Sequence, residues 1–172
     1  KHLEELLNAS DEKTLVSLMH VNNEIGNLLD IQKVGELCKS KNALFHSDTV
    51  QSVGHFELDL NQIKVDFTAV SAHKFHGPKG VGFLYVNKKL RINPLIHGGA
   101  QERNMRGGTE NVYGIIGLAK AMEIACRDME EHRSHVQGLK DRMIRGLKEK
   151  IAGVAFNGDS ANADRSLYTV LN

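Results

Sequence analysis

Short apolar runs of strand length alternate with segments of helical spacing along this chain. The apolar runs fall at residues 14–21, 43–46, 65–70 and 82–86, and each predicts a strand. The first run is apolar over most of its length, which is typical of a strand buried on both faces of a parallel sheet. Apolar residues at 31, 34, 37 and 38 predict an amphipathic helix over 31–40, with Asp30 as its N-cap.

Turn and loop signals complete the prediction for the first two thirds of the chain. Residues 1–9 have the pattern of a helix end, with Leu3, Leu6 and Leu7 on one face. The spacer at 78–81 is short enough for a hairpin, so we expect the fourth strand to be antiparallel. Residues 95–108 contain two Gly-Gly pairs and are expected to form a loop.

A long helical pattern then runs from Tyr113 to Ile151, interrupted by Arg133 and weakened by Gly138 and Gly146. A helix of this length often leaves one domain for another. Residues from Gly153 onward are therefore expected to begin a second domain.

Composition narrows the class of protein. The chain has 172 residues, of which 41% are hydrophobic and 25% are charged, as in an ordinary globular domain with a real core. A net charge of +1 gives no electrostatic reason to expect a nucleic-acid or membrane partner. Cys38 and Cys126 suggest no disulfide framework, so we expect a reducing compartment such as the cytoplasm. Both lie in helical patterns and are expected to be buried.

The two ends of the chain are unusual. Residue 1 is Lys, and the last residues, 168–172, look like the middle of a strand. We therefore expect the sequence to be a piece of a longer protein whose other parts carry some of the chemistry.

The segment Ser71–Gly80 is the strongest candidate for a functional site, because it follows directly after the strand predicted at 65–70. Ligands of α/β proteins bind where strands end. A partly desolvated Lys74 at this place would act as an amine nucleophile and form Schiff bases with aldehydes. The alternative is a basic turn that only closes the strand.

Three further motifs follow predicted strands or precede the long helix: Asn22-Asn23-Glu24, Asp48 with Gln51, and the loop from Gly98 to Thr109. Each could be a turn or a helix cap, with Thr109 capping the long helix. Together with Ser71, His73 and Lys74 they converge on one edge of a sheet. A pyridoxal phosphate site needs a lysine, a carboxylate at the ring nitrogen, phosphate donors and a polar group at the phenolic oxygen. Lys74, Asp48, the hydroxyls of Ser71 and Thr109, and Gln51 supply this set.

Histidine pairs give a weaker signal. His73 and His76 are three residues apart, as are His132 and His135, but no third ligand cluster accompanies them, so no metal site is expected. His132 and His135 are expected on a solvated face. His20, His46 and His97 are expected to support the site at most.

The segments HVNNEIG, SDTVQSVG, SAHKFHGPKGVGFLYV and HGGAQERNMRGGTEN also resemble one family, the cysteine desulfurases, and keep its order and near spacing. These are fold type I pyridoxal phosphate enzymes of the class V aminotransferase superfamily. The resemblance implies a three-layer α/β sandwich with a mostly parallel sheet. Residues 1–150 would be an incomplete cofactor-binding large domain with its long connecting helix, and residues 151–172 would begin the small C-terminal domain.

The resemblance also implies a role for each site residue. Lys74 matches the lysine that binds the cofactor aldehyde and later moves protons at the substrate α-carbon. Asp48 matches the partner of the pyridine nitrogen, and Gln51 the donor to the phenolic oxygen. The remaining matches are Asn23 near that oxygen and the substrate carboxylate, Ser71 and His73 at the phosphate, and Thr109 at the phosphate of a neighbouring subunit.

The implied reaction removes sulfur from L-cysteine and leaves L-alanine and an enzyme persulfide. A homodimer and a sulfur acceptor, an iron–sulfur scaffold or a tRNA thiolation partner, are implied as well. Thr49-Val50 departs from the small residues more usual in the family. The family's N-terminal phosphate-binding loop, stacking His, persulfide-forming Cys and carboxylate-binding Arg find no match, so we expect this chain alone to be inactive. Open alternatives are a selenocysteine lyase or aminotransferase of the same superfamily, and a non-catalytic folding or dimerisation module.

Overall fold

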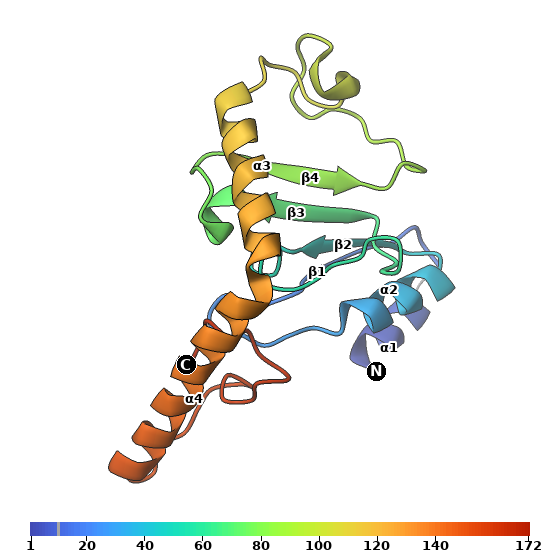
Figure 1. The fold of residues 1–172 in the computed structure, drawn as a ribbon. Coiled ribbons are helices and arrows are strands. Elements are labelled where there is room, and N and C mark those ends of the chain that lie inside the picture. The colour runs from blue at the N-terminus through green and yellow to red at the C-terminus, as the bar shows by residue number, and fades with distance from the viewer. Residues whose placement is uncertain (10) are drawn as a thin grey trace.

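A single four-stranded sheet organises the chain, as a computed structural model of residues 1–9 and 11–172 shows (Figure 1). The strand order is β1-β2-β3-β4. β1 (Leu15–Met19), β2 (Leu44–Asp48) and β3 (Phe67–Ser71) are parallel, and β4 (Gly82–Val86) pairs antiparallel with β3. The predicted mostly parallel α/β sheet, with its antiparallel fourth strand, is confirmed.

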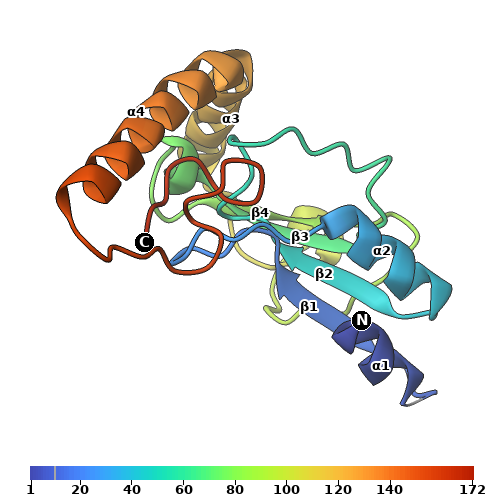
Figure 2. The ribbon, with the colours of Figure 1, turned by 90° about the horizontal axis from the view of Figure 1, so that it is seen from below.

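Helices α2 (Ile31–Ser40) and α3 (Val112–Arg127) lie against the same face of the sheet (Figure 2). Ser47 of β2 pairs with Thr68 of β3, so their side chains lie on the same face of the sheet. Side chains two residues apart on a strand also share a face, which adds Phe45 on β2 and Val70 on β3. Phe45 belongs to the buried cluster of α2, and Val70 packs with Leu118 of α3.

The opposite face of the sheet carries large apolar side chains that remain exposed. Leu15 and Met19 of β1 are 57% and 36% exposed, and Leu84 of β4 is 51% exposed. The prediction that residues 14–21 are buried on both faces is therefore wrong for this chain. The reason is that α1 (His2–Asn8), α2 and α3 pack on the other face of the sheet, so these side chains lack a covering layer in the described part of the chain.

The predicted helix at 31–40 is confirmed with its cap. Asp30 Oδ1 accepts a hydrogen bond of 3.0 Å from the amide of Lys33. The first helix, α1 (His2–Asn8), places Leu3 and Leu7 against the α2 cluster, but Leu6 is 57% exposed. Leu3 and Leu7 are one helical turn apart, whereas Leu6 lies away from that line, so only two of the three leucines share the buried face.

The long helical pattern forms two helices instead of one. α3 ends at Arg127 and α4 (Met129–Lys150) follows, with Asp128 between them at φ −101° and ψ 9°. The helical hydrogen bonds continue across Asp128. Its amide donates to the Ile124 carbonyl and its carbonyl accepts from the amide of His132, both at 3.0 Å. The helix axis therefore bends at Asp128 without a loop (Figure 1).

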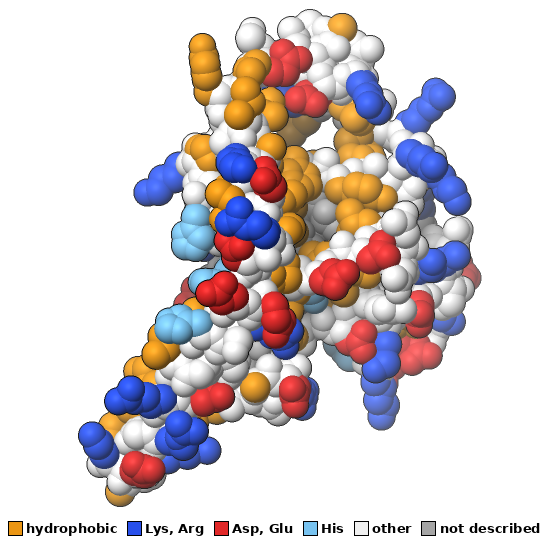
Figure 3. Space-filling view, in the orientation of Figure 1, with side chains coloured by type: hydrophobic (Ala, Val, Ile, Leu, Met, Phe, Trp, Pro, Cys, Tyr) orange, Lys and Arg blue, Asp and Glu red, His pale blue; other side chains and the backbone are white. Residues whose placement is uncertain are grey.

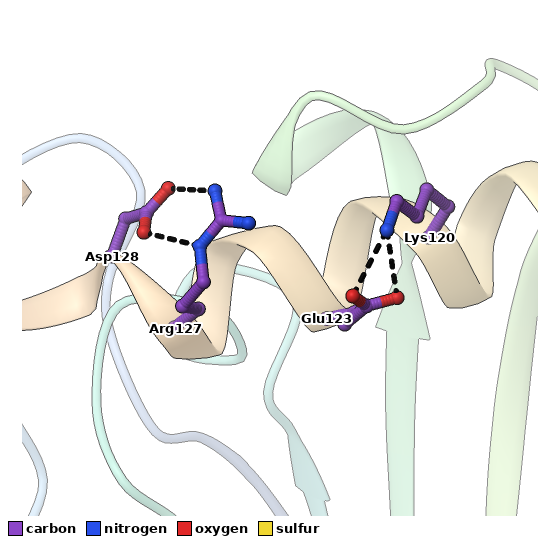
Figure 4. A network of polar contacts seen from close by, with 4 residues as sticks. All are labelled: Lys120, Glu123, Arg127 and Asp128. Atoms are coloured by element: carbon purple, nitrogen blue, oxygen red, sulfur yellow. Dashed lines mark hydrogen bonds and ion pairs between the residues drawn. The ribbon is translucent and has the colours of Figure 1, made fainter.

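Two ion pairs lie along the exposed side of α3 (Figure 4). Lys120 Nζ contacts both carboxylate oxygens of Glu123, and the Arg127 guanidinium makes two hydrogen bonds of 2.6 and 2.7 Å to Asp128. The second pair holds the Asp128 side chain at the bend. The N-cap of α3 is Asn111, whose Oδ1 accepts from the amide of Gly114, so the alternative in which Thr109 caps this helix is wrong.

The last residues of the chain pack back on α4 and on the loop after β1. Leu167 and Tyr168 are buried with Val21, next to Val136 of α4. Lys140 is buried, and its Nζ donates to the Leu167 carbonyl and to Ser166 Oγ, both at 2.9 Å. Burial lowers the pKa of Lys140.

Close packing of α2 against the segment before β3 generates a testable prediction. A Cβ added at Gly35 would lie 2.6 Å from the Lys64 carbonyl oxygen, whereas one added at Gly146 of α4 would meet nothing within 4 Å. We expect Gly35→Ala to lower the free energy of unfolding by about 1–3 kcal/mol, because the clash outweighs the better helix propensity of alanine. Gly146→Ala, the matched control, should raise it by about 0.5–1 kcal/mol. Urea unfolding followed by circular dichroism distinguishes the two, and equal effects would contradict the packing argument.

Candidate active site

Parallel pairing brings the carboxyl ends of three strands to one edge of the sheet. Met19 of β1 pairs with Asp48 of β2, and Asp48 pairs with Ala69 of β3. The amide of His20 continues this pairing with a 2.9 Å bond to the Asp48 carbonyl. Of the seven predicted site residues, six lie at these strand ends or within a few residues after them: Asn23, Asp48, Gln51, Ser71, His73 and Lys74.

Lys74 lies in η1 (Ala72–Phe75), a single 3₁₀ turn that continues directly from Ser71 at the end of β3. Ala72 and Phe75 are buried against α3, while His73 is exposed and Lys74 is half-buried. Apolar anchors three residues apart thus hold the turn on the core and leave the two polar side chains outside it. His76 closes the turn in the left-handed conformation, at φ 66°.

Asp48 is fixed by the turn that follows β2. One carboxylate oxygen, Oδ1, accepts a 2.9 Å bond from the amide of Val50. Thr49 is buried, and both its amide and its hydroxyl donate to the Ala69 carbonyl on β3. The threonine that departs from the family pattern therefore adds a bond between β2 and β3 beside Asp48. Gln51 is half-buried in the same turn.

Asn23 lies in a turn after β1 that is stabilised by its neighbour. Asn22 Oδ1 accepts from the amides of Glu24 and Ile25, at 2.9 and 3.0 Å. Asn23 is exposed, and its Nδ2 donates to Glu24 Oε1 at 2.7 Å. The segment is a turn, as one of the two interpretations of the sequence proposed, and it carries Asn23 at the edge where the strands end.

Thr109 is the predicted site residue that the chain does not bring to the others. It is exposed, and it lies between η2 (Gln101–Asn104) and the first residue of α3. Among the described residues no hydrogen bond or ion pair joins it to the other six. The long segment before it stands beyond β4 (Figure 1), because β4 runs away from the edge where β1 to β3 end.

Three histidines were expected to support the site. His46 Nδ1 lies 2.8 Å from Ser17 Oγ, and His97 is exposed. His20 is 7% exposed, with its ring centroid 6.1 Å from that of Phe56, and its Nδ1 has no hydrogen-bond partner among the described residues. Burial lowers the pKa of His20 to about 4, so its ring is neutral at pH 7.

The two cysteines lie outside the candidate site. Cys38 is buried, and burial raises the pKa of its thiol. Cys126 is exposed, so the prediction that it is buried is wrong. It lies one residue past Ala125, which packs on the core, and it lines an apolar cavity.

In the described part of the chain no three His, Cys, Asp or Glu side chains are grouped as a metal site would require, and no helix is long and apolar enough to cross a membrane.

Sequence reasoning missed His55, which contacts the turn that carries the lysine. His55 Nε2 lies 3.2 Å from the Lys74 carbonyl oxygen, and its Nδ1 lies 2.7 Å from the Tyr168 hydroxyl. A single histidine in a turn has no periodicity or spacing that would mark it, and its partner Tyr168 is 113 residues away. Only the tertiary structure could find this pair.

A mostly parallel sheet with a lysine turn and a carboxylate at the carboxyl ends of its strands is typical of an α/β enzyme that binds a ligand at this place. Residues 1–171 match the family Aminotransferase class-V, and the chain belongs to this family. Cysteine desulfurase IscS of Clostridium botulinum is 48% identical over 157 residues, which are 91% of this chain and 40% of that protein. Cysteine desulfurase IscS of Dictyoglomus turgidum is 47% identical over 86% of this chain and 38% of its own length.

Solved structures agree with this assignment. A NifS-like protein of 43% identity has a TM-score of 0.88 over 98% of this chain and 46% of its own. A NifS-like protein from Rickettsia africae has a TM-score of 0.90 at 35% identity, over 97% of this chain and 46% of its own. The expected family and fold type are therefore confirmed. The chain spans about two fifths of the length of the curated relatives that it matches.

Burial of His20 beside the site predicts a pH-dependent stability. Its pKa is about 4 in the folded chain and about 6.5 when unfolded, so the unfolded state binds more protons between these values and stability falls as the pH drops through this window. We expect a loss of about 2 kcal/mol from His20 between pH 7 and pH 5.

Urea unfolding at pH 7 and pH 5 measures this loss. His20→Leu removes the titrating ring, so its stability should change less over the same range than that of the original chain. His135→Leu, at an exposed position on α4, is the matched control and should retain the full loss. Parallel pH profiles for the original chain and His20→Leu would contradict the assignment.

Proposed function

We propose that this chain is the cofactor-binding part of a pyridoxal phosphate-dependent cysteine desulfurase. The observation that supports this most is the turn η1, which presents Lys74 at the same edge of the sheet as Asp48. A lysine and a carboxylate at the carboxyl ends of parallel strands are what a Schiff-base cofactor with a basic ring nitrogen requires. The relatives named cysteine desulfurase supply the reaction type, and the whole protein's activity is part of the proposal.

The residues present fit such a cofactor. The set combines a primary amine, a carboxylate, a hydroxyl, an imidazole and two side-chain amides, and each of the six residues is half-buried or exposed. Lys74 would bind the aldehyde, and Asp48 the ring nitrogen. Gln51 and Asn23 would lie at the phenolic oxygen, and Ser71 and His73 at the phosphate. When bound, pyridoxal phosphate supplies a ring that accepts the electron pair left on the substrate α-carbon.

Each of the two central side chains has a defined task in this proposal. Asp48 would hold the ring nitrogen, and the amide of Val50 keeps its carboxylate in place. Lys74 would hold the cofactor aldehyde through its amine. Lys74 would also act as the general base that takes the proton from the substrate α-carbon. The buried turn anchors Ala72 and Phe75 limit how far this amine can move.

The proposed substrate is L-cysteine, and the products are L-alanine and a persulfide on a cysteine outside this chain. A sulfur-acceptor scaffold protein, or a tRNA thiolation partner, would take the sulfur. A homodimer is proposed because Thr109 lies apart from the other six residues, where a residue that acts on a neighbouring subunit would lie. The proposed cytoplasmic location rests on the two free cysteines. We also propose that residues 1–150 form the large domain and that residues 151–172 begin the small one.

Reductive trapping tests the cofactor site. The chain is incubated with pyridoxal phosphate, reduced with borohydride, digested and mapped by mass spectrometry. We expect a phosphopyridoxyl adduct at Lys74, because this amine is held at the sheet edge, and a much smaller one at Lys79, an exposed lysine five residues later. Lys74→Arg should abolish the adduct and Lys79→Arg should leave it unchanged. An adduct spread over surface lysines would instead support a folding or dimerisation module without a working site.

The two cysteines of this chain decide which activity is expected of it. We expect no alanine release from L-cysteine by this chain alone, because neither Cys38 nor Cys126 matches the position of the persulfide-forming cysteine. Amino-acid analysis after incubation with cysteine and pyridoxal phosphate measures this directly. Robust alanine release that persists in a Cys38→Ala, Cys126→Ala double variant would show that sulfur leaves without an enzyme thiol, and the proposed division of labour would be wrong.

A further inference from the structure

A chain of polar side chains joins the Lys74 turn to the last residues of the described structure. His55 bridges the Lys74 carbonyl oxygen, 3.2 Å from Nε2, and the Tyr168 hydroxyl, 2.7 Å from Nδ1. His132 of α4 places its Nδ1 3.2 Å from the same hydroxyl. His55 and Tyr168 are only 8% and 2% exposed, so the bond between them is shielded from water, while the bonds to the Lys74 carbonyl and to His132 are partly buried.

The chemistry of the atoms decides which partner donates in each of these three hydrogen bonds. A carbonyl oxygen only accepts, so His55 Nε2 carries the hydrogen and donates it to Lys74. In the neutral ring Nδ1 is then an acceptor, and the Tyr168 hydroxyl must donate to it. The hydroxyl oxygen is left to accept from His132 Nδ1. The order of donation is therefore His132 to Tyr168, Tyr168 to His55, and His55 to the Lys74 backbone.

Burial keeps His55 in the neutral form that this order requires. Desolvation lowers its pKa most, the bond to the Lys74 carbonyl raises it, and the nearby His132 and His76 lower it again. The ring centroids of His76 and His132 are 6.4 Å apart. Histidine side chains gather beside the junction of α3 and α4 (Figure 3). A proton added to His55 would put a donor on Nδ1 and reverse the bond to Tyr168.

Tyr168 is held firmly enough to serve as the far anchor. Its ring makes edge contacts with those of His55 and His132, at centroid distances of 5.5 and 5.8 Å. Its backbone neighbour Leu167 receives a hydrogen bond from the buried Lys140. The carbonyls at the end of a short helical turn such as η1 lack partners within the turn, and His55 supplies one to Lys74 itself.

We propose that His55 and Tyr168 are positioning residues for Lys74, because they fix the backbone from which its amine reaches the site. Through these two residues, the position of the Lys74 backbone depends on how residues 166–168 pack against α4. The relevance to catalysis rests on the proposed function, in which Lys74 is the reactive amine. The placement itself is a property of the chain and is measured without the cofactor.

Reductive methylation with formaldehyde and cyanoborohydride measures how accessible each lysine amine is. The rate at Lys74 is compared with that at exposed Lys79, and labelling of buried Lys140 reports whether the end of the chain has loosened as a whole. In Tyr168→Phe and His55→Leu we expect the Lys74 to Lys79 ratio to rise about fivefold, the population change that loss of one hydrogen bond produces. Lys140 should stay protected in both variants.

His55→Gln is the rescue variant, because its amide can donate to the Lys74 carbonyl and accept from Tyr168. We expect its ratio to lie within about twofold of the original, on the strength of that retained pair. His135→Gln, an exposed histidine on α4, is the control and should change nothing. A ratio that is unchanged in folded Tyr168→Phe and His55→Leu, or one that rises only together with Lys140 labelling, would overturn the proposal.

Trapping with pyridoxal phosphate gives a second readout with the opposite sign. Variants that free Lys74 should label faster with formaldehyde and yet form less of the specific phosphopyridoxyl adduct, because the amine is no longer aligned with the rest of the site. Absence of that adduct in the original chain would contradict the proposed function alone. The methylation ratios would still decide whether His55 and Tyr168 position Lys74.

Discussion

Parallel pairing of β1, β2 and β3 is the constraint on which the rest of the structure depends. Residues that follow different strands in the sequence meet in space only because parallel strands end at the same edge. Asp48 is fixed at this edge by its pairing with Met19 and Ala69, and Ser71 and Lys74 follow from the next strand. An antiparallel sheet of the same strands would scatter these residues over two opposite edges.

The helices limit how far the residues of the candidate site at this edge can move. α3 covers the core beneath η1, so Ala72 and Phe75 are anchored while Lys74 is not. α4 and the last residues of the chain act at longer range, since they bury Tyr168 and through His55 reach the backbone of Lys74. The same lysine is therefore supported from two directions, by apolar packing on one side and by directed hydrogen bonds on the other.

Exposure of one face of the sheet sets this chain apart from a self-sufficient domain. Leu15, Met19 and Leu84 are exposed on the face that carries Asp48 and Ser71, since residues of equal parity on paired strands point the same way. The chain matches only about two fifths of its curated relatives. The candidate site therefore lies on a sheet face whose apolar side chains are exposed in the described part of the chain.

The sequence by itself determined the local elements and the chemical type of the site. Apolar runs, the Asp30 cap and the Lys74 turn are local patterns, so strand and helix ranges, the antiparallel fourth strand and the candidate residues could be predicted from it. Tertiary structure alone decided which residues are buried, as with Leu6, Met19 and Cys126, because burial depends on what packs against a side chain and not on its type. It also decided the bend at Asp128, the separation of Thr109, and the pairing of His55 with Tyr168. No local pattern could encode that last contact, because it forms only after the end of the chain has folded back over α4.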